Sequence, residues 1–328
     1  MMRKLIFTLL TITTLNATYA HQVGDQIQSE NETYTLIKEM GEGAFGKVFE
    51  ATDSQNHHYA IKCYKAKLET SSKLFDLLND VEREYHRGQL FDHPNIIKSY
   101  DLFSGNLDSE GEQQYYLILD FVAGKTVYTT KKRTISFDQS LLAAEHLVEG
   151  LTHALRRGYL HLDLHLNNVM LDDKSDAVII DLASFFSWNE LVKYANKDSN
   201  SSKKKAIAVH ADLIREKKLD AFFKQHPKIL NALKKDTSLL SKSKPENDQR
   251  IEDTKLLYHP YYFDKITEAV VSIIGKSTLE KEEKLAIRAE VKKLAWSFKE
   301  DSEDGLNTSE TIDQAIDELL EILNNTNN

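Results

Sequence analysis

One short segment of the chain carries acids and amides at a spacing that suits phosphate chemistry. Residues 161–168 read HLDLHLNN and include Asp163 and Asn168, and Asp181 follows at the end of an apolar strand. Phosphoryl transfer requires little covalent chemistry from a protein, so catalysis depends on placing charges around the moving group. Asp163 could orient a hydroxyl, while the Asn168 amide and the Asp181 carboxylate could hold Mg²⁺. His161 by itself is expected to be a packed core histidine.

A second candidate for phosphate binding is a glycine-rich segment near the start of the chain. Residues 41–48 read GEGAFGKV and fit the pattern G-x-G-x-x-G-x-V. In a dinucleotide-binding turn such glycines precede a helix, but strand-forming residues follow them here. The segment therefore predicts a hairpin that folds over the phosphates of a nucleotide. An ordinary glycine hairpin is the alternative.

A lysine and an acid further along the chain could complete the phosphate site. Lys62 ends the sequence Ala60-Ile61-Lys62 on a predicted third strand, where its amine would reach the α and β phosphates under the hairpin. Glu84 lies on the helix predicted after that strand, and an ion pair with it would fix the direction of the lysine. Glu82 is the competing partner on the same helix. Taken alone, Lys62 would be an ordinary exposed strand residue.

The elements that must position these residues begin with a β-rich group. Strand-forming residues broken by turn residues predict three antiparallel strands within 34–65. Apolar residues at helical spacing predict a helix over 72–91, and two further strands are expected at 99–103 and 115–122. Five strands and one helix would form a small first lobe.

A second group of elements is mainly helical. The pattern predicts a helix over 137–157 and a hairpin made of 169–171 and 177–180. Most of the remaining chain is helical in pattern, with exposed loops expected at 196–205 and 236–248. A β-rich lobe that precedes an α-rich lobe predicts an α+β fold.

The motifs, in this order and at this spacing, resemble those of the eukaryotic-type protein kinases, with Ser/Thr-like character, over residues 34–263. The resemblance implies a two-lobed fold, with an N-lobe at about 34–122 and a C-lobe at about 123–263. It also implies ATP and Mg²⁺ as cofactors. In such a kinase Lys62 would pair with Glu84.

The same resemblance assigns roles to the other candidate residues. Asp163 would be the catalytic base, and Asn168 and Asp181 would bind the metal. The glycine hairpin would contact the nucleotide through Gly41, Glu42, Gly43 and Gly46. The adenine pocket would be lined by Val48, Ala60 and Met170, with Leu119 as gatekeeper and the backbone of Asp120 and Val122 as hinge.

Two features bear on the substrate and point to different classes. Residues 259–262 read HPYY, and with Arg250 before them they resemble the R-I-x(7)-H-P-F-F close of a protein-kinase domain, which favours a protein substrate. His165 stands where Ser/Thr kinases carry a lysine near the γ-phosphate, and a protonated imidazole could act there. The phrase H-x-D-x-H is also similar to that of antibiotic and choline kinases, so small molecules remain the alternative.

Several positions depart from the family pattern. Leu162 replaces an arginine that would bind a phosphorylated activation loop, so switching by that route is not expected. Asp181 begins D-L-A instead of D-F-G, and no A-P-E occurs before Asp212, which could head the central helix of the large lobe. Gly88 is expected to leave a gap where an apolar side chain is usual. The nucleotide-binding residues keep the family pattern while the regulatory and substrate parts do not, which argues against a nucleotide-binding pseudokinase scaffold, the further alternative.

The N-terminus and the composition indicate where the chain works. Arg3 and Lys4 precede an apolar run that closes on Ala20, which predicts a secretory signal peptide over 1–20. No membrane span is expected after its removal. Acidic residues outnumber basic ones by 51 to 42, for a formal net charge of −9, which argues against a nucleic-acid partner. A single cysteine, Cys63, excludes an internal disulfide framework.

These observations favour an exported Ser/Thr protein kinase that acts as an effector. ATP is scarce outside cells, so the kinase must work where ATP is supplied, in the cytosol of a host cell or in a secretory compartment. A bacterial effector delivered into a host, where a host protein could be the substrate, is the preferred interpretation. Residues 264–328 form a predicted helical, acidic extension. It would be either an amphipathic cap on the large lobe or a tail that binds a partner.

Overall fold

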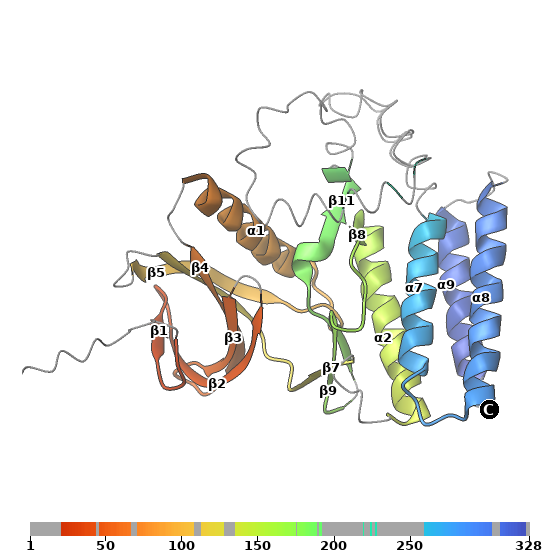
Figure 1. Cartoon of the computed structure of the whole chain (residues 1–328), viewed down its shortest axis with the longest axis horizontal. Helices are drawn as coiled ribbons and strands as arrows, with labels where there is room; N and C mark the ends of the chain where they lie inside the picture. The colour runs from red at the N-terminus through yellow and green to blue at the C-terminus, as the bar shows by residue number, and fades with distance from the viewer. Residues whose placement is uncertain are drawn as a thin grey trace, which may run out of the picture.

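The computed structural model describes residues 21–43, 46–66, 71–107, 113–127, 135–174, 176–188, 190–191, 219, 224, 227, 259–303 and 309–325. A curled β-sheet with one helix forms one end of the molecule, and a group of helices forms the other (Figure 1). This arrangement confirms the predicted α+β, two-lobed fold. The predicted signal peptide, Asp212, Arg250 and the two predicted loops at 196–205 and 236–248 lie outside the described residues.

The first lobe is a six-stranded antiparallel sheet with the order β1-β2-β3-β4-β6-β5. Its strands are β1 (Gln26–Gln28), β2 (Thr33–Gly43), β3 (Gly46–Thr52), β4 (His58–Ala66), β5 (Ser99–Leu107) and β6 (Gln113–Asp120). Alternating residues such as Phe49, Ile61 and Ile118 point to one face and form a core of their own. The five predicted strands are confirmed, and β1 is one the sequence did not predict.

Helix α1 (Ser71–Leu90) packs against β5 and approaches it closely at Gly88. A Cβ added at Gly88 would lie 2.7 Å from the backbone nitrogen of Ser99 and 2.5 Å from its Oγ. The Ser99 hydroxyl donates to the carbonyl of Tyr85 at 2.5 Å. The expected gap at Gly88 is therefore wrong. Glycine lets the helix backbone approach the strand, and Ser99 occupies the space.

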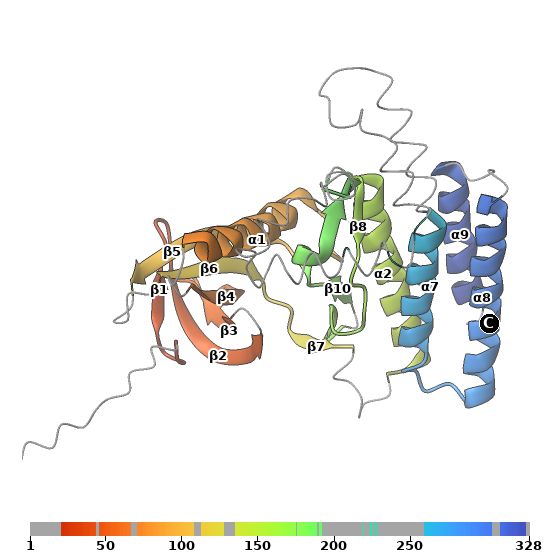
Figure 2. The same cartoon turned by 45° about the horizontal axis from the view of Figure 1, so that its top comes forward.

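Four helices of the second lobe stand side by side (Figures 1 and 2). They are α2 (Phe137–Arg156), α7 (His259–Ile274), α8 (Lys281–Glu303) and α9 (Ser309–Asn325). A capping box starts α2: the Ser136 side chain accepts from the backbone nitrogen of Gln139, and the Gln139 side chain accepts from the backbone nitrogen of Ser136. The observed α2 confirms the predicted helix over 137–157.

The end of the family resemblance, residue 263, lies inside α7 and not between two elements. Phe263 and Ile266 of this helix are fully buried. Leu319 and Leu323 of α9 are also fully buried and belong to the same apolar core as α2. These contacts support the interpretation of the C-terminal extension as a cap on the large lobe. The division into separate domains stays a prediction.

Short strands between the lobes carry the residues of most chemical interest. The predicted hairpin is present as β9 (Val169–Asp172) and β10 (Ala177–Ile179), and β7 (Gly124–Thr126) pairs with β9. A second small sheet joins β8 (Tyr159–His161) to β11 (Phe185–Ser187). A 3-10 turn, η2 (Leu182–Ser184), connects β10 to β11.

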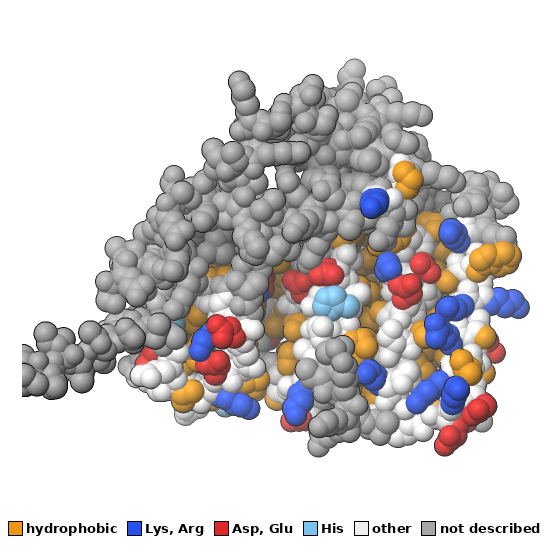
Figure 3. Space-filling view, viewed as in Figure 1, with side chains coloured by type: hydrophobic (Ala, Val, Ile, Leu, Met, Phe, Trp, Pro, Cys, Tyr) orange, Lys and Arg blue, Asp and Glu red, His pale blue; other side chains and the backbone are white. Residues whose placement is uncertain are grey.

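The helices, the charged surface and the single cysteine were each described from the sequence, and the structure adds the following. Among the helices described, none is both long enough and apolar enough to cross a bilayer. Basic side chains are spread over the helical end of the molecule in the view of Figure 3. Exposed basic residues of α8 include Lys281, Arg288 and Lys292. Cys63 is a buried free thiol, and burial raises its pKa to about 12, so it stays protonated.

Candidate active site

Lys62 on β4 and Glu84 on α1 form an ion pair that joins the sheet to the helix. Lys62 Nζ lies 2.9 Å from each carboxylate oxygen of Glu84, and the Tyr64 hydroxyl donates to Glu84 Oε2 at 2.7 Å. The Glu84 side chain is 4% exposed and that of Lys62 is 28% exposed. Removing one charge from such a pair costs about 3–5 kcal/mol, because the other charge is left uncompensated. The pair therefore fixes the direction of the Lys62 amine.

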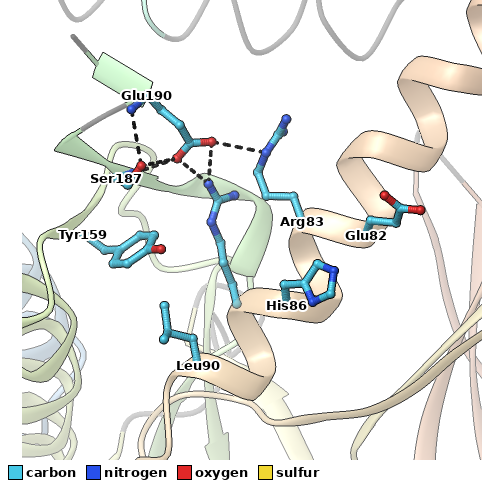
Figure 4. A pocket seen from close by; sticks show the side chains of 8 residues that line it. Glu82, Arg83, His86, Leu90, Tyr159, Ser187 and Glu190 are labelled. Carbon is cyan, nitrogen blue, oxygen red and sulfur yellow. Dashed lines mark hydrogen bonds and ion pairs between the residues drawn. The ribbon is translucent and has the colours of Figure 1, made fainter. Parts of the chain in front are cut away.

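The local structure explains why these two side chains meet. Alternation along β4 turns Ile61 and Cys63 into the core of the sheet, whereas Tyr64 belongs to the core beneath α1. Lys62 lies on the same face as Tyr64. Glu84 is buried on the side of α1 that faces β4, while Glu82 is exposed and lines a pocket on another side of the helix (Figure 4). The geometry therefore selects Glu84 over its competitor.

The glycine-rich segment forms the β2–β3 hairpin, as predicted from its flanking residues. Gly43 pairs with Gly46 across the turn, and residues 44 and 45 lie outside the described residues. Gly46 has a φ of 149°, and a Cβ there would lie 1.8 Å from the carbonyl oxygen of Cys63. Only glycine fits at this position. A Cβ at Gly41 would instead meet no atom within 4 Å, so the outer strand of the hairpin is open there.

The loop between β8 and β9 gathers the polar groups of the second half of the site. Asn168 Nδ2 donates to the backbone carbonyl of Asp163 at 2.9 Å and to Asp181 Oδ2 at 3.3 Å. The backbone closes the same loop, because the Asn168 nitrogen donates to the His165 carbonyl at 2.9 Å. The nitrogen of Ile180, just before Asp181, donates to the Asn168 carbonyl at 3.0 Å. These bonds fix the plane of the Asn168 amide between the two aspartates.

Asp181 begins the turn that stands in place of D-F-G. Its Oδ2 accepts a hydrogen bond from the Ser184 hydroxyl, and its carbonyl accepts from the Ser184 backbone nitrogen at 3.3 Å. Leu182 is fully buried, and the turn packs against α1. The position of the Asp181 carboxylate is therefore linked to that of the helix that carries Glu84. Sequence reasoning missed Ser184, because its role depends on the conformation of the turn.

His165 adds an imidazole beside the Asp163 carboxylate. Its Nε2 lies 3.7 Å from Asp163 Oδ2, and the two side chains are 45% and 35% exposed. Its Nδ1 accepts a hydrogen bond of 3.2 Å from the backbone nitrogen of Asn167. Its Nε2 also lies 3.3 Å from Asn168 Nδ2, so the ring contacts the predicted base and the predicted metal-binding amide together. A role of this imidazole near the γ-phosphate stays a prediction.

The predicted hinge follows β6. Leu119 is 5% exposed and pairs with Ala60 on β4, and Val48 on β3 pairs with Lys62. The Asp120 carboxylate accepts from the Tyr100 hydroxyl at 2.5 Å. Burial, followed by this hydrogen bond, raises the pKa of Tyr100, so the phenol stays protonated and continues to donate.

The chain after the hinge returns to the site through β7, which the sequence did not predict. Val122 is half-buried, and it is followed by the three residues of β7, which pair with β9. In that register Thr126 lies opposite Met170. The strand β7 therefore connects the predicted hinge to Met170, the predicted adenine-pocket residue on β9. Glu42 is exposed on the outer strand of the hairpin.

His161 lies in the core of the second lobe, apart from the polar groups of the loop between β8 and β9. It is 2% exposed, and its ring packs edge-to-face on Phe185, with the ring centroids 4.8 Å apart. This confirms the expected core histidine. His259 and Tyr262, at the start of α7, are buried in the same lobe, and burial raises the pKa of Tyr262.

The donor set suits Mg²⁺ held together with a polyphosphate. Carboxylate and carboxamide oxygens are the ligands that Mg²⁺ prefers, and Asn168 and Asp181 provide one of each. Among the described residues there is no group of three or more His, Cys, Asp or Glu side chains that could hold a metal ion. Mg²⁺ usually keeps several waters and depends on substrate phosphates in such sites. The residues present therefore fit a metal that arrives with its nucleotide.

One half of the site is the glycine hairpin with the Lys62–Glu84 pair, and the other is the loop between β8 and β9 with Asp181. In this fold the two halves are those of a protein kinase domain. The family model of the protein kinase domain matches residues 34–197, which include the glycine hairpin, the Lys62–Glu84 pair and the loop with Asp163, Asn168 and Asp181. The chain belongs to this family.

Curated relatives are similar over the same part of the chain. The chain is 30% identical over 151 residues to the probable serine/threonine-protein kinase glkA of Dictyostelium discoideum, covering 46% of this chain and 29% of that protein. It is 30% identical over 172 residues to calcium-dependent protein kinase 4 of Plasmodium falciparum (51% and 30%). It is 27% identical over 157 residues to the serine/threonine-protein kinase PrkC of Bacillus subtilis (45% and 22%). The matches span less than a third of the length of each of these relatives.

Proposed function

We propose that this chain is an ATP- and Mg²⁺-dependent protein kinase that transfers the γ-phosphoryl group to serine or threonine hydroxyls. One observation carries the proposal. The Asn168 amide is bonded both to the loop of Asp163 and to the Asp181 carboxylate, so the orienting acid and the two metal-binding oxygens form one unit. Two of the curated relatives, from Dictyostelium discoideum and Bacillus subtilis, are named as serine/threonine-protein kinases, which supports the choice of acceptor.

The residues of the chain divide the work as follows. Lys62, held by Glu84, binds the α and β phosphates and places the nucleotide under the glycine hairpin. Asp163 orients the acceptor hydroxyl and accepts its proton as the new oxygen–phosphorus bond forms and the bond from the γ-phosphorus to the bridging oxygen breaks, which releases ADP. Asn168 and Asp181 would hold Mg²⁺, which would neutralise charge on the phosphates. The His165 imidazole, with Nε2 3.7 Å from Asp163 Oδ2, limits where that carboxylate can lie.

The substrate class is the part of the proposal that needs the most direct test. The buried start of α7, which carries HPYY, supports a protein substrate by its resemblance to the family's closing motif. His165 beside Asp163 supports the small-molecule alternative, because it keeps the H-x-D-x-H phrase at the site. The family match and the relatives favour proteins.

Incubation of the purified chain with γ-labelled ATP and a cell lysate tests this choice. We expect mass spectrometry to find the label on serine and threonine residues of lysate proteins. Rapid phosphorylation of aminoglycosides, choline or sugars, with proteins and the chain itself unlabelled, would show a small-molecule kinase. Label in neither class, with Mg-ATP binding intact, would show a pseudokinase scaffold.

We further propose that the kinase is exported by a signal peptide at 1–20 and acts as an effector on a host protein. The support is the charge and apolar pattern of that segment. Expression in the source cell, followed by N-terminal sequencing of the protein in the medium, is expected to give an N-terminus at His21. Recovery of the full-length chain from the cytosol alone would contradict export.

A further inference from the structure

A cluster of charges lies on the side of α1 that faces β11 and the residues after it. We define the Glu190 cluster as Arg83 and Arg87 of α1, Ser187 of β11, and Glu190 (Figure 4). Arg87 Nη2 lies 2.9 and 2.7 Å from the two carboxylate oxygens of Glu190, and Arg83 Nε lies 3.3 Å from Oε1. One carboxylate therefore holds two arginines of the same helix.

Glu190 is itself held in place by its own segment. The backbone nitrogen and the hydroxyl of Ser187 donate to Glu190 Oε2 at 2.7 and 3.0 Å. The Glu190 backbone nitrogen donates back to the Ser187 hydroxyl at 3.3 Å. The carboxylate is thus oriented by the chain that follows Asp181, and its contact with α1 is a contact between that chain and the helix.

Burial makes these ion pairs stronger than typical surface pairs. The Arg87 side chain is 4% exposed, and those of Arg83 and Glu190 are 19% and 20% exposed. The Arg87 guanidinium also lies over the ring of Phe186, 5.8 Å from its centroid. Charges removed from water attract each other more strongly, and a buried arginine without its acid is costly.

The cluster acts on the helix that presents Glu84. Arg83 and Arg87 are four residues apart and lie on one face of α1, and Glu84 lies on the adjacent face toward β4. The helix is therefore held from two directions, by Lys62 of the sheet and by Glu190 of the segment after β11. A rotation of α1 that separated Glu84 from Lys62 would also have to pull two guanidinium groups away from Glu190.

We propose that Glu190 is a positioning residue that holds α1 in the orientation in which Glu84 engages Lys62. The proposal rests on the proposed role of that pair in binding the nucleotide. We call the contact of Glu190 with Arg83 and Arg87 the brace. A glutamate is charged without any modification, so the brace is present as soon as the chain folds. It also suits a chain in which Leu162 offers no cation to a phosphorylated segment. The kinase is therefore active without phosphorylation of the segment after Asp181.

The first experiment compares Glu190→Gln with Asp313→Asn in the full chain. Asp313 accepts from Arg156 Nη2 at 2.9 Å between α9 and α2, and both side chains are well exposed, so the control removes an ion-pair charge far from α1. We expect Glu190→Gln to speed hydrogen exchange in peptides covering 81–90. We expect it to lower kcat/KM for ATP at least about ten-fold, chiefly through a higher KM for ATP. The control is expected to match the wild type in both readouts.

The second experiment is chemical rescue. The Glu190 cluster lines a pocket of about 490 Å³, so a small anion can reach the arginines once the Glu190 side chain is truncated. We expect acetate or formate to restore part of the lost kcat/KM and of the exchange protection in Glu190→Ala, whereas sodium chloride of equal ionic strength does not. If Glu190 served only general stability, acetate and formate would restore no more activity than sodium chloride does. Absence of recovery specific to these anions would therefore contradict the brace.

Two further measurements separate the possible failures. If Glu190→Gln does not fold, as the loss of a cooperative melting transition would show, Arg83→Gln takes its place. It removes one of the two contacts and is expected to give a smaller rise in hydrogen exchange and a smaller loss of kcat/KM. Unchanged exchange in 81–90 together with unchanged kcat/KM would overturn the brace. Hydrogen exchange requires no turnover. If the wild-type chain transfers no phosphate, the proposed function fails while the brace is still measured by exchange.

Discussion

Replacement of Asp163 by asparagine is expected to reduce phosphoryl transfer by about 10²–10⁴-fold, the range typical of a general base. The substitution keeps the size of the side chain but removes the charge that orients the hydroxyl and accepts its proton. The backbone carbonyl that accepts from Asn168 is unchanged, so the loop keeps its shape. Binding of Mg-ATP is therefore expected to persist. Single-turnover transfer and nucleotide affinity, measured on the same preparation, check both parts.

Asp173→Asn is the matched control for this change. Asp173 is exposed in the turn between β9 and β10, and its substitution removes the same charge from the same lobe. It is expected to leave transfer and melting temperature close to those of the wild type. Near-wild-type single-turnover transfer by Asp163→Asn would show that another group is the base.

Much of the first lobe could be predicted because its pattern is local. Strand-forming residues alternate between turns from β2 to β4, and the turn residues mark where each strand ends. Lys62 and the glycine hairpin then come together through strand pairing alone. The choice between Glu84 and Glu82 could not be made on the same basis. It depends on which side of α1 faces β4, and tertiary packing decides that.

The parts that sequence reasoning missed depend on contacts between distant segments. The strands β7, β8 and β11 have three residues each, and each is defined by the strand with which it pairs. Arg87 and Glu190 are 103 residues apart in the sequence, so no local pattern predicts the pair. Gly88 was misjudged for the same reason: only the fold shows that Ser99 lies against it.

A final prediction concerns Asp181→Asn, which separates an enzyme from a scaffold. The asparagine can still accept hydrogen bonds from Ser184 and Asn168, but it loses the charge that attracts Mg²⁺. We expect the Mg²⁺ concentration needed for half-maximal transfer to rise at least about ten-fold and the transfer rate to fall about 10²-fold or more. Transfer rates over a series of free Mg²⁺ concentrations, at saturating ATP, measure both effects.

Ser184→Ala gives the comparison that isolates the charge. It removes a hydrogen bond to the same oxygen of Asp181 but leaves the carboxylate, so a much smaller shift in Mg²⁺ dependence is expected. An unchanged Mg²⁺ dependence in Asp181→Asn would show that this carboxylate is not a metal ligand. At equal expression and matched melting temperature, cellular effects that survive Asp181→Asn would identify the chain as a scaffold. Their loss, with Ser184→Ala retaining them, would show that the effects require phosphoryl transfer.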